Sequence, residues 1–407
     1  MPNRRSRASK ALSAWLAVVH PLSVAFCGAL SLLLFSGVEP AAAQSTVRSN
    51  QVVDPSHPEL LEESLFLKIP RSKGDYRLEA IVVRPAKAQG RLPVALLTHG
   101  KPRSASEMAL VRPETLVRQA RDLAYRGYLA VGVVRRGYGR SDGTPGVATN
   151  AAYAKCTTAD LQKYFDVEAD DLEAALRVVT ERPDADGSGS IVIGASVGGG
   201  AALALAARKP KGLVAAVNIA GAVRLTNAQG EVICPYDTPI SALARFGAAS
   251  IPPSLWIYSE NDSVFAPDIA RRAHAAFRAA GGTADLLIVP AIPPDGHHAF
   301  ELPNGRVHWL AALDAFLRSR KLTTWQPSQV DTVMRAAGVP GSNRDLVEKY
   351  FSLYTPKILL QGGDRRVTYT ADTRNLASAR DAGLASCEKW AKEKCRVLME
   401  NFRMTLP

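Results

Sequence analysis

Short apolar runs alternate with longer amphipathic stretches between residues 63 and 320. Turn residues bound the apolar runs, which is typical of buried strands, and the longer stretches have helical periodicity. Strands that alternate with helices of this length predict an α/β fold built on a doubly wound, mostly parallel sheet. The expected strands are 63–69, 76–83, 92–97, 128–134, 190–193, 213–219, 254–258 and 284–289, and the expected helices are 113–126, 164–180, 201–208, 267–280 and 307–319.

Three further segments depart from this alternation. Residues 44–62 are polar and contain prolines, which indicates a linker, and residues 221–250 are expected to form an irregular insertion. Residues 321–407 are expected to form a small C-terminal α+β extension of the main domain, 63–320, with no recognisable set of catalytic residues. Within this extension the pattern predicts short helices over 325–354, a strand over 366–371, a helix over 376–391 and a strand over 395–402.

The first 43 residues have the pattern of a secretory signal peptide. Four basic residues at positions 4, 5, 7 and 10 precede an apolar span that is densest over 24–35. Ala41-Ala42-Ala43 then offers a cleavage site after Ala43. We expect export to the periplasm or the medium, with no stable membrane span once the peptide is removed. The alternative is an uncleaved membrane anchor, because the apolar span is long.

Charge argues against one class of partner. The formal net charge is +12, and removal of residues 1–43 takes away four basic residues and one acid, which leaves +9. The remaining basic residues are scattered, with no Lys/Arg-rich tract and no repeat that combines aromatic and basic residues. We therefore expect no nucleic-acid partner.

Four cysteines remain after the signal peptide, and an even number in an oxidising compartment predicts two disulfides. Three pairings are possible. We favour Cys156 with Cys234 and Cys387 with Cys395, because each bridge then lies within one domain. The second bridge requires the helix over 376–391 to end before residue 395, since eight residues of continuous helix would separate the two cysteines by about 12 Å. No CxxC motif is present, so we expect no metal site.

One stretch carries a chemical signature. Gly194-Ala195-Ser196-Val197-Gly198 fits G-x-S-x-G and lies between a predicted strand and a predicted helix. This is the context of a nucleophile elbow, in which a serine on a sharp turn faces the first N–H groups of the next helix. The alternative is an ordinary glycine-rich turn between a strand and a helix.

Two more strand ends supply the partners that a serine nucleophile needs. Asp262 follows the strand 254–258, and His297 follows the strand 284–289. The chain order Ser, Asp, His, each just past a strand, is the order found in α/β-hydrolases. We expect His297 to act as the base and Asp262 to orient it. His298 is an alternative base, and Asp268, at the start of a helix, is an alternative acid.

The strand 92–97 is followed by Thr98-His99-Gly100-Lys101, which we expect to form half of an oxyanion hole. Pro102 has no N–H, so this loop would contribute the backbone N–H of Lys101. The N–H of Val197 would supply the other half. His99 is expected to play a structural part within the loop.

These motifs give residues 63–320 a resemblance to the α/β-hydrolase superfamily, in the dienelactone-hydrolase-like branch near acyl-peptidases and acetyl esterases. The run Arg136 to Gly143 resembles the loop after the fourth strand in that superfamily, and Thr98-His99-Gly100 resembles its oxyanion loop. Dienelactone hydrolases proper have a Cys nucleophile where this chain has Ser196. The resemblance therefore implies hydrolysis of an ester or an amide by a serine.

The expected function is hydrolysis of a small carboxylic ester or acyl substrate, without a cofactor, by an exported serine hydrolase. An acyl- or dipeptidyl-type peptidase would use the same three residues and is the first alternative. A non-catalytic envelope binding protein on a hydrolase scaffold is the second. Residues 144–160 and 221–250 are expected to shape the substrate pocket, because they lie beside the catalytic strand ends.

Overall fold

The computed structural model describes residues 50–71, 74–102, 104–146, 156–223, 225, 234–249, 252–372 and 374–405. All of them belong to one compact unit, Val47–Pro407. The predicted signal peptide, residues 1–43, lies outside the described residues. Within the described ranges, no helix is long and apolar enough to cross a membrane.

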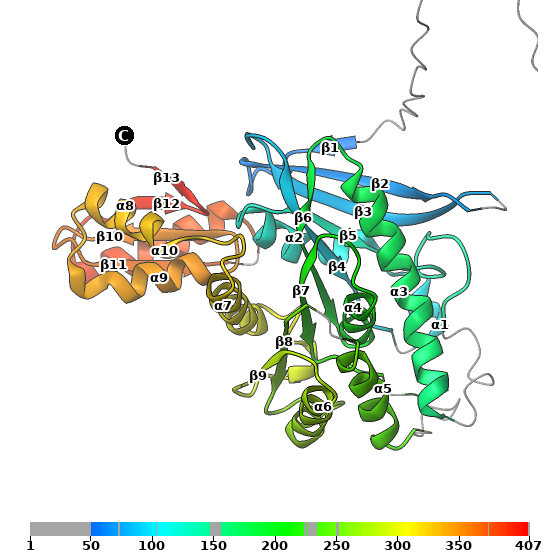
Figure 1. Cartoon of the computed structure of the whole chain (residues 1–407). Helices are drawn as coiled ribbons and strands as arrows, with labels where there is room; N and C mark the ends of the chain where they lie inside the picture. The colour runs from blue at the N-terminus through cyan, green and yellow to red at the C-terminus, as the bar shows by residue number, and fades with distance from the viewer. Residues whose placement is uncertain are drawn as a thin grey trace, which may run out of the picture. The chain divides into compact units, whose positions relative to one another are not determined.

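Nine strands form the main sheet in the order β1-β2-β3-β5-β4-β6-β7-β8-β9 (Figure 1). The six strands from β5 to β9 in this order are parallel, whereas β1, β2 and β3 pair antiparallel with their neighbours. The predicted α/β fold with a mostly parallel sheet is thus confirmed. The strands are β1 (Asn50–Val52), β2 (Leu60–Ile69), β3 (Tyr76–Pro85), β4 (Leu92–Thr98), β5 (Leu129–Val133), β6 (Ala185–Ala195), β7 (Leu213–Ile219), β8 (Ser254–Ser259) and β9 (Ala284–Val289).

The strand order reverses at β4. The chain leaves β4 for β5 on one side and then crosses to β6 on the other side. In open parallel sheets, ligands bind outside the carboxyl ends of the strands at such a switch point. The loop after β4 and the turn after β6 therefore meet where chemistry is expected.

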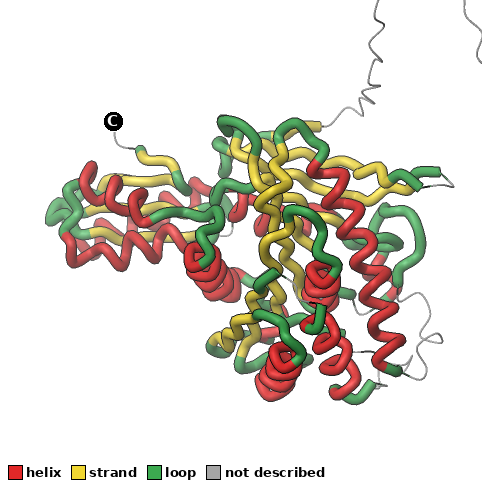
Figure 2. Tube along the Cα trace, viewed as in Figure 1, coloured by secondary structure: helices red, strands yellow, loops and turns green. Residues whose placement is uncertain are grey.

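Helices cover both faces of this sheet, red around the yellow strands in Figure 2. Val94 and Leu96 of β4 join the core beneath α3, α4, α5 and α6, whereas Ala95 and Leu97 join the core beneath α2 and α7. This alternation is the period of two expected for a strand buried on both faces. The helices are α1 (Ala105–Met108), η1 (Pro113–Leu116), α2 (Val117–Ala124), α3 (Thr158–Thr180), α4 (Val197–Ala207), α5 (Asp237–Gly247), α6 (Pro267–Ala279), η3 (Gly296–His298) and α7 (Pro303–Ser319).

The C-terminal extension is a smaller antiparallel sheet in the order β11-β10-β12-β13, with helices on both faces. Leu359 packs toward α8 and α9, and its neighbours Ile358 and Leu360 pack toward α10. The predicted α+β extension is confirmed. Its elements are α8 (Pro327–Ala337), η4 (Gly341–Asn343), α9 (Arg344–Ser352), β10 (Lys357–Gln361), β11 (Val367–Ala371), α10 (Leu376–Ala391), β12 (Arg396–Glu400) and β13 (Arg403–Met404).

Strand β10 was not predicted. Its apolar centre is only Ile358-Leu359-Leu360, which is too short to show a period. The strand expected over 395–402 is divided, because Asn401 adopts a left-handed conformation (φ 52°) that turns the chain between β12 and β13. Helix α10 ends at Ala391, before Cys395, and the structure joins Cys387 to Cys395 in a disulfide.

Several boundaries also differ from expectation: β6 begins at Ala185 rather than at residue 190, and α4 begins at Val197 rather than at residue 201. Helix α3 begins well before residue 164, because Thr157 and Asp160 form a capping box: each side chain accepts a hydrogen bond from the other's backbone N–H. The segment 221–250, expected to be irregular, contains α5. The segment 44–62, expected to be a linker, contains β1 and the first residues of β2.

Asp314, on α7, joins the main domain to the start of the extension. Its carboxylate is fully buried and accepts from Arg126 Nε at 2.7 Å, from Thr324 Oγ1 at 2.6 Å and from Trp325 Nε1 at 2.9 Å. Buried charges are tolerated only when they are paired and hydrogen-bonded in this way. Arg126 lies two residues after the end of α2, so one carboxylate links α7, the segment that follows α2 and the extension.

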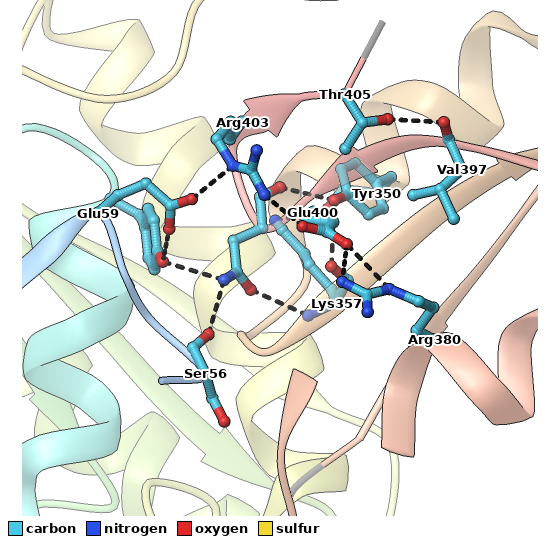
Figure 3. Close-up of polar contacts among 11 residues, drawn as sticks. Ser56, Glu59, Tyr350, Lys357, Arg380, Val397, Glu400, Arg403 and Thr405 are labelled. Atoms are coloured by element: carbon cyan, nitrogen blue, oxygen red, sulfur yellow. Dashed lines mark hydrogen bonds and ion pairs between the residues drawn. The ribbon is translucent and has the colours of Figure 1, made fainter. Parts of the chain in front are cut away.

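Asp122, on α2, makes a similar set of contacts to a later part of the extension. It is fully buried, pairs with Arg306 of α7, and accepts the N–H of Thr355 at 2.9 Å. A third group of contacts surrounds Arg403, whose Nε lies 2.9 Å from the Glu59 carboxylate (Figure 3). The extension is therefore bonded to the main domain through buried polar groups as well as at the surface.

Lys357 lies beside Tyr350, a residue near the C-terminal end of α9 (Figure 3). Its Nζ is fully buried and donates to the carbonyl oxygens of Tyr350 at 2.7 Å, Phe351 at 2.9 Å and Leu353 at 3.0 Å. Burial lowers the pKa of Lys357 well below its ordinary value. The last carbonyls of a helix lack intrahelical donors, so the Lys357 side chain satisfies them and ties α9 to β10.

Removal of the Asp314 carboxylate should strongly destabilise the protein, because Arg126 would be left buried without a counter-ion. We expect Asp314→Ala to lower the free energy of unfolding by about 3–5 kcal/mol, measured by urea denaturation. The matched control is Asp285→Ala, which removes an ion pair with Arg320 in which Asp285 is exposed and should cost less than about 1 kcal/mol. Equal losses in the two variants would contradict this reading of Asp314.

A buried histidine should make the fold sensitive to mild acid. His57 is 2% exposed, and burial together with the nearby charge of Arg121 lowers its pKa to about 4. In the unfolded chain His57 binds a proton near pH 6.5, whereas in the folded chain it does so only near pH 4. The free energy of unfolding should therefore fall as the pH drops from 6.5 to about 4. A shift of this size corresponds to about 3 kcal/mol.

The variant His57→Gln should flatten that dependence, measured as denaturation midpoints at several pH values across the same window. His99, whose pKa is also lowered, contributes in the same direction in both proteins and cancels in the comparison. If the variant keeps the slope of the wild type, His57 does not carry the effect.

Candidate active site

Ser196 lies on a strained turn between β6 and α4. Its backbone has φ 51° and ψ −124°, a region that residues with a side chain rarely adopt. The surroundings hold it there: the Ser196 N–H donates to the Ile219 carbonyl at 2.9 Å, and the Gly199 N–H donates to the Ser196 carbonyl at 2.9 Å. A Cβ at Gly194 would lie 2.0 Å from the carbonyl oxygen of Gly198, so this turn requires its glycine.

The structure brings Ser196, Asp262 and His297 into one hydrogen-bonded row. Asp262 Oδ1 lies 3.1 Å from His297 Nδ1, and His297 Nε2 lies 3.2 Å from Ser196 Oγ. The carboxylate cannot donate, so Nδ1–H donates to it, and the serine O–H donates to the free Nε2. Asp262 is 5% exposed and also accepts the N–H groups of Val264 and Phe265 at 2.9 and 2.8 Å.

The two alternatives from the sequence lie elsewhere. His298 follows His297 on the 3₁₀ turn η3 and borders the same pocket, but the structure gives it no hydrogen bond to Ser196 or Asp262 in the described ranges. Asp268 lies in the first turn of α6, where a negative charge suits the helix dipole. The geometry thus favours His297 and Asp262.

Asp295 connects the two loops that carry His297 and Asp262, a role that the sequence pattern does not predict. Its carboxylate accepts the N–H of His297 at 2.9 Å and both the N–H and the O–H of Ser263, at 3.1 and 2.5 Å. Partial burial would raise the pKa of Asp295, but these hydrogen bonds outweigh it and lower the pKa. The signal available in the sequence was an Asp two residues before the His, the spacing of a local side-chain cap.

The predicted oxyanion loop lies against the serine. A Cβ on Gly100 would be 3.2 Å from the Cβ and 3.8 Å from the Oγ of Ser196. Val197 is the first residue of α4, so its N–H has no acceptor within the helix. The backbone N–H groups of Lys101 and Val197 thus remain the predicted pair of donors.

His99 holds this loop from behind. Its Nδ1–H donates to the carbonyl oxygen of Gly100 at 2.6 Å, and its Nε2 accepts the backbone N–H of Arg135 at 3.1 Å. Burial and the charge of Arg135 keep the pKa of His99 well below its ordinary value. A neutral imidazole with one donating and one accepting nitrogen fits both bonds, which agrees with the structural part expected for it.

A pocket of about 220 Å³ opens over these groups, lined by Ser196, His297, His298 and the loop from His99 to Pro102. Burial lowers the pKa of the Lys101 side chain, which borders it. The described residues contain no cluster of three or more His, Cys, Asp or Glu side chains that would hold a metal ion. Ser196 and His297, which border this pocket, suit nucleophilic and acid–base chemistry.

A disulfide joins the two segments that are expected to shape the pocket, 144–160 and 221–250. The structure bonds Cys156 to Cys234, with 5.5 Å between their Cα atoms. The bridge ties the start of α3 to the segment that leads into α5. Residues 147–155 and 226–233 lie outside the described residues, so the expected pocket role of 144–160 and 221–250 stays a prediction.

Comparison with known families agrees with this arrangement. Residues 73–240, less than half of the chain, match the family described as X-Pro dipeptidyl-peptidase (S15 family). The match includes Ser196 and its turn but ends before Asp262 and His297. The strand order, the strained serine turn after β6 and the row formed by Ser196, His297 and Asp262 are those of the α/β-hydrolase fold. Similarity to this family is consistent with a serine hydrolase and does not distinguish ester from peptide substrates.

Solved structures similar to this chain include a putative dienelactone hydrolase from Klebsiella pneumoniae (20% identity, TM-score 0.43, covering 62% of this chain and 97% of that one). Others are an acetyl xylan esterase from Paenibacillus sp. R4 (18%, 0.47, 67% and 88%) and dipeptidyl peptidase 4 from Porphyromonas gingivalis (18%, 0.46, 63% and 35%). At these identities and TM-scores, the similar structures add no evidence beyond the fold that the strand order already shows. The comparison with curated proteins found no match.

Loss of the Asp295 carboxylate should impair turnover more than stability. Without it, His297 and the Asp262 loop lose a shared anchor, and small displacements of catalytic groups reduce rates by large factors. We expect Asp295→Ala to lower kcat by about tenfold or more, measured with an activated ester. Asp268→Ala, which removes a carboxylate of the first turn of α6, is the control and should leave kcat unchanged. Equal kcat values in the two variants would contradict this role.

Proposed function

We propose that this α/β-hydrolase is an exported serine hydrolase that cleaves a carboxylic ester through an acyl-enzyme intermediate. The observation that carries the proposal is the row of two hydrogen bonds, 3.1 Å from Asp262 to His297 and 3.2 Å from His297 to Ser196. A serine hydroxyl is a poor nucleophile until a base removes its proton, and this row supplies both the base and the group that orients it.

In the first half-reaction, Ser196 Oγ attacks the carbonyl carbon while His297 Nε2 takes the Oγ proton. The carbonyl electron pair moves to oxygen, where the N–H groups of Lys101 and Val197 stabilise the negative charge. Asp262 stabilises the imidazolium and keeps its tautomer. When the intermediate collapses, the C–O bond of the ester breaks and Nε2 returns the proton to the departing alkoxide.

The second half-reaction repeats these steps with water. His297 Nε2 removes a proton from a water molecule, whose oxygen attacks the acyl carbon, and the proton then passes to Ser196 Oγ as the acid leaves. Each proton that His297 accepts is given back, so the cycle needs no cofactor. His297 must be neutral at the start of each half-reaction, because its Nε2 has to accept a proton from Ser196 or from water.

A second candidate is supported by one observation, the match of residues 73–240 to the X-Pro dipeptidyl-peptidase family. A peptidase would use the same three residues, with an amine as the leaving group. Amines leave poorly unless they are protonated, so His297 would carry more of the barrier as a general acid. Hydrolysis of a Gly-Pro-p-nitroanilide faster than of simple esters would favour this candidate.

Export is supported by the composition of residues 1–43 and by the two disulfides of the structure, which persist in oxidising compartments. Removal of the leader would be seen as a mature N-terminus at Gln44 in protein recovered from the periplasm or the medium. A chain that keeps residues 1–43 and stays with the membrane fraction would contradict export as a cleaved protein.

The nucleophile can be tested directly. Wild type should be labelled by a fluorophosphonate probe and should hydrolyse p-nitrophenyl acetate or octanoate, and Ser196→Ala should lose labelling and at least about 10⁴-fold in kcat. Ser188→Ala, which changes an exposed serine outside the pocket, is the control and should behave as wild type. No labelling of folded wild type would contradict the proposal and favour a binding protein on this scaffold.

A further inference from the structure

Two neighbouring arginines after β5 each pair with a carboxylate on α3. Arg135 Nε donates to Glu168 Oε2, and Arg136 Nε donates to Asp171 Oδ1 at 2.8 Å. The two acids are three residues apart, so they lie on the same side of α3. Arg135 is fully buried and Glu168 is 2% exposed. The two ion pairs look alike, but they face different parts of the molecule.

The Arg135 pair faces the oxyanion loop. Arg135 Nη1 donates to the carbonyl oxygen of His99 at 2.6 Å and to the hydroxyl of Thr98, and its backbone N–H donates to His99 Nε2 at 3.1 Å. One residue thus holds both the backbone and the ring of His99. The ring in turn donates from Nδ1 to the carbonyl oxygen of Gly100 at 2.6 Å.

This last bond determines where the N–H of Lys101 points. The Gly100 carbonyl and the Lys101 N–H belong to the same peptide group, which is planar and trans, so they point in opposite directions. A carbonyl fixed toward His99 therefore directs the N–H away from it. Because Gly100 packs against Ser196, the opposite side of this peptide is where the oxyanion of an acyl intermediate would form.

We propose that Arg135, itself held by Glu168, is a positioning residue for the oxyanion hole that acts through His99 on the Lys101 N–H. The inference rests on the proposed serine hydrolase function. Arg135 touches no substrate. Its contribution is preorganisation, because an N–H fixed in advance stabilises developing charge without reorganising during the reaction.

Arg136 and Asp171 provide a matched control. Asp171 is fully buried like Glu168, accepts the backbone N–H of Arg136 at 2.7 Å, and also accepts the Tyr76 hydroxyl at 2.7 Å. These contacts fasten α3 to the start of β3 and leave residues 98–101 untouched. Loss of this second pair tests what a buried ion pair in this region does for the fold alone.

The experiment compares two double variants in the full chain. Arg135→Met/Glu168→Leu and Arg136→Met/Asp171→Leu each remove both charges, so that neither leaves an unpaired buried ion. For the first we expect kcat on p-nitrophenyl acetate to fall about 10- to 100-fold with KM within about threefold, since one oxyanion donor is worth about 10²–10³. For the second we expect kcat within about threefold of wild type.

A second readout separates positioning from general loosening. A trifluoromethyl ketone inhibitor forms an oxyanion in the site, so its Ki should rise in the first double variant by about the same factor as kcat/KM falls. Thermal melting of both variants shows whether their stabilities are comparable. If the first variant does not fold, Arg135→Lys, which keeps the buried positive charge beside Glu168 but loses the Nη1 bonds to Thr98 and His99, should lower kcat with KM unchanged.

The outcomes are distinct. Equal kcat and equal Ki in the two double variants, or an unchanged kcat in Arg135→Lys, would overturn the role of Arg135 while leaving the serine hydrolase function intact. Absence of labelling and turnover in folded wild type would overturn the proposed function and this inference together. Loss of kcat and inhibitor affinity in the Arg135 variant alone would establish the inference.

Discussion

The strained turn at Ser196 is the constraint on which the candidate site depends. A serine with φ 51° is held in place only by close packing on every side. The same packing brings the next loop near: a Cβ at Gly198 would lie 2.5 Å from the carbonyl oxygen of His99. The turn at Ser196 and the oxyanion loop are therefore in close backbone contact, and a shift of one would displace the other. The contacts that hold the Ser196 backbone in its strained conformation also hold the oxyanion loop in place beside it.

The positions of Ser196, Asp262 and His297 were predictable because each directly follows a strand of a parallel sheet. Parallel strands end at the same edge, so residues distant in sequence converge without any local signal. The sequence left His298 as an alternative base, and the structure favours His297 through its bonds to Asp262 and Ser196. The pairing of Asp295 with Ser263 was not predictable, because this bond connects two loops that are distant in the sequence.

Packing between distant segments explains the other omissions. Arg126 and Asp314 lie far apart in the chain, and nothing near either residue marks them as a buried pair. Strand β10 has too few apolar residues to show a pattern, and it becomes a strand because β11 and β12 pair with it on both sides. The start of α3 was the exception: Thr157 and Asp160 form a recognisable capping box that the apolar pattern, beginning later, obscured.

The bonds between Asp122 and Thr355 bear on how the chain acquires its structure as it is made. Helix α2 lies early in the sequence, yet the backbone donor for its buried carboxylate comes from residue 355, and the Asn401 amide donates to the hydroxyl of Tyr125, which follows α2, at 3.0 Å. A domain that is complete in itself folds as soon as it leaves the ribosome. Here Asp122 and Tyr125 gain these two hydrogen-bond donors only after residues 355 and 401 have been made, so the final packing around α2 follows their synthesis.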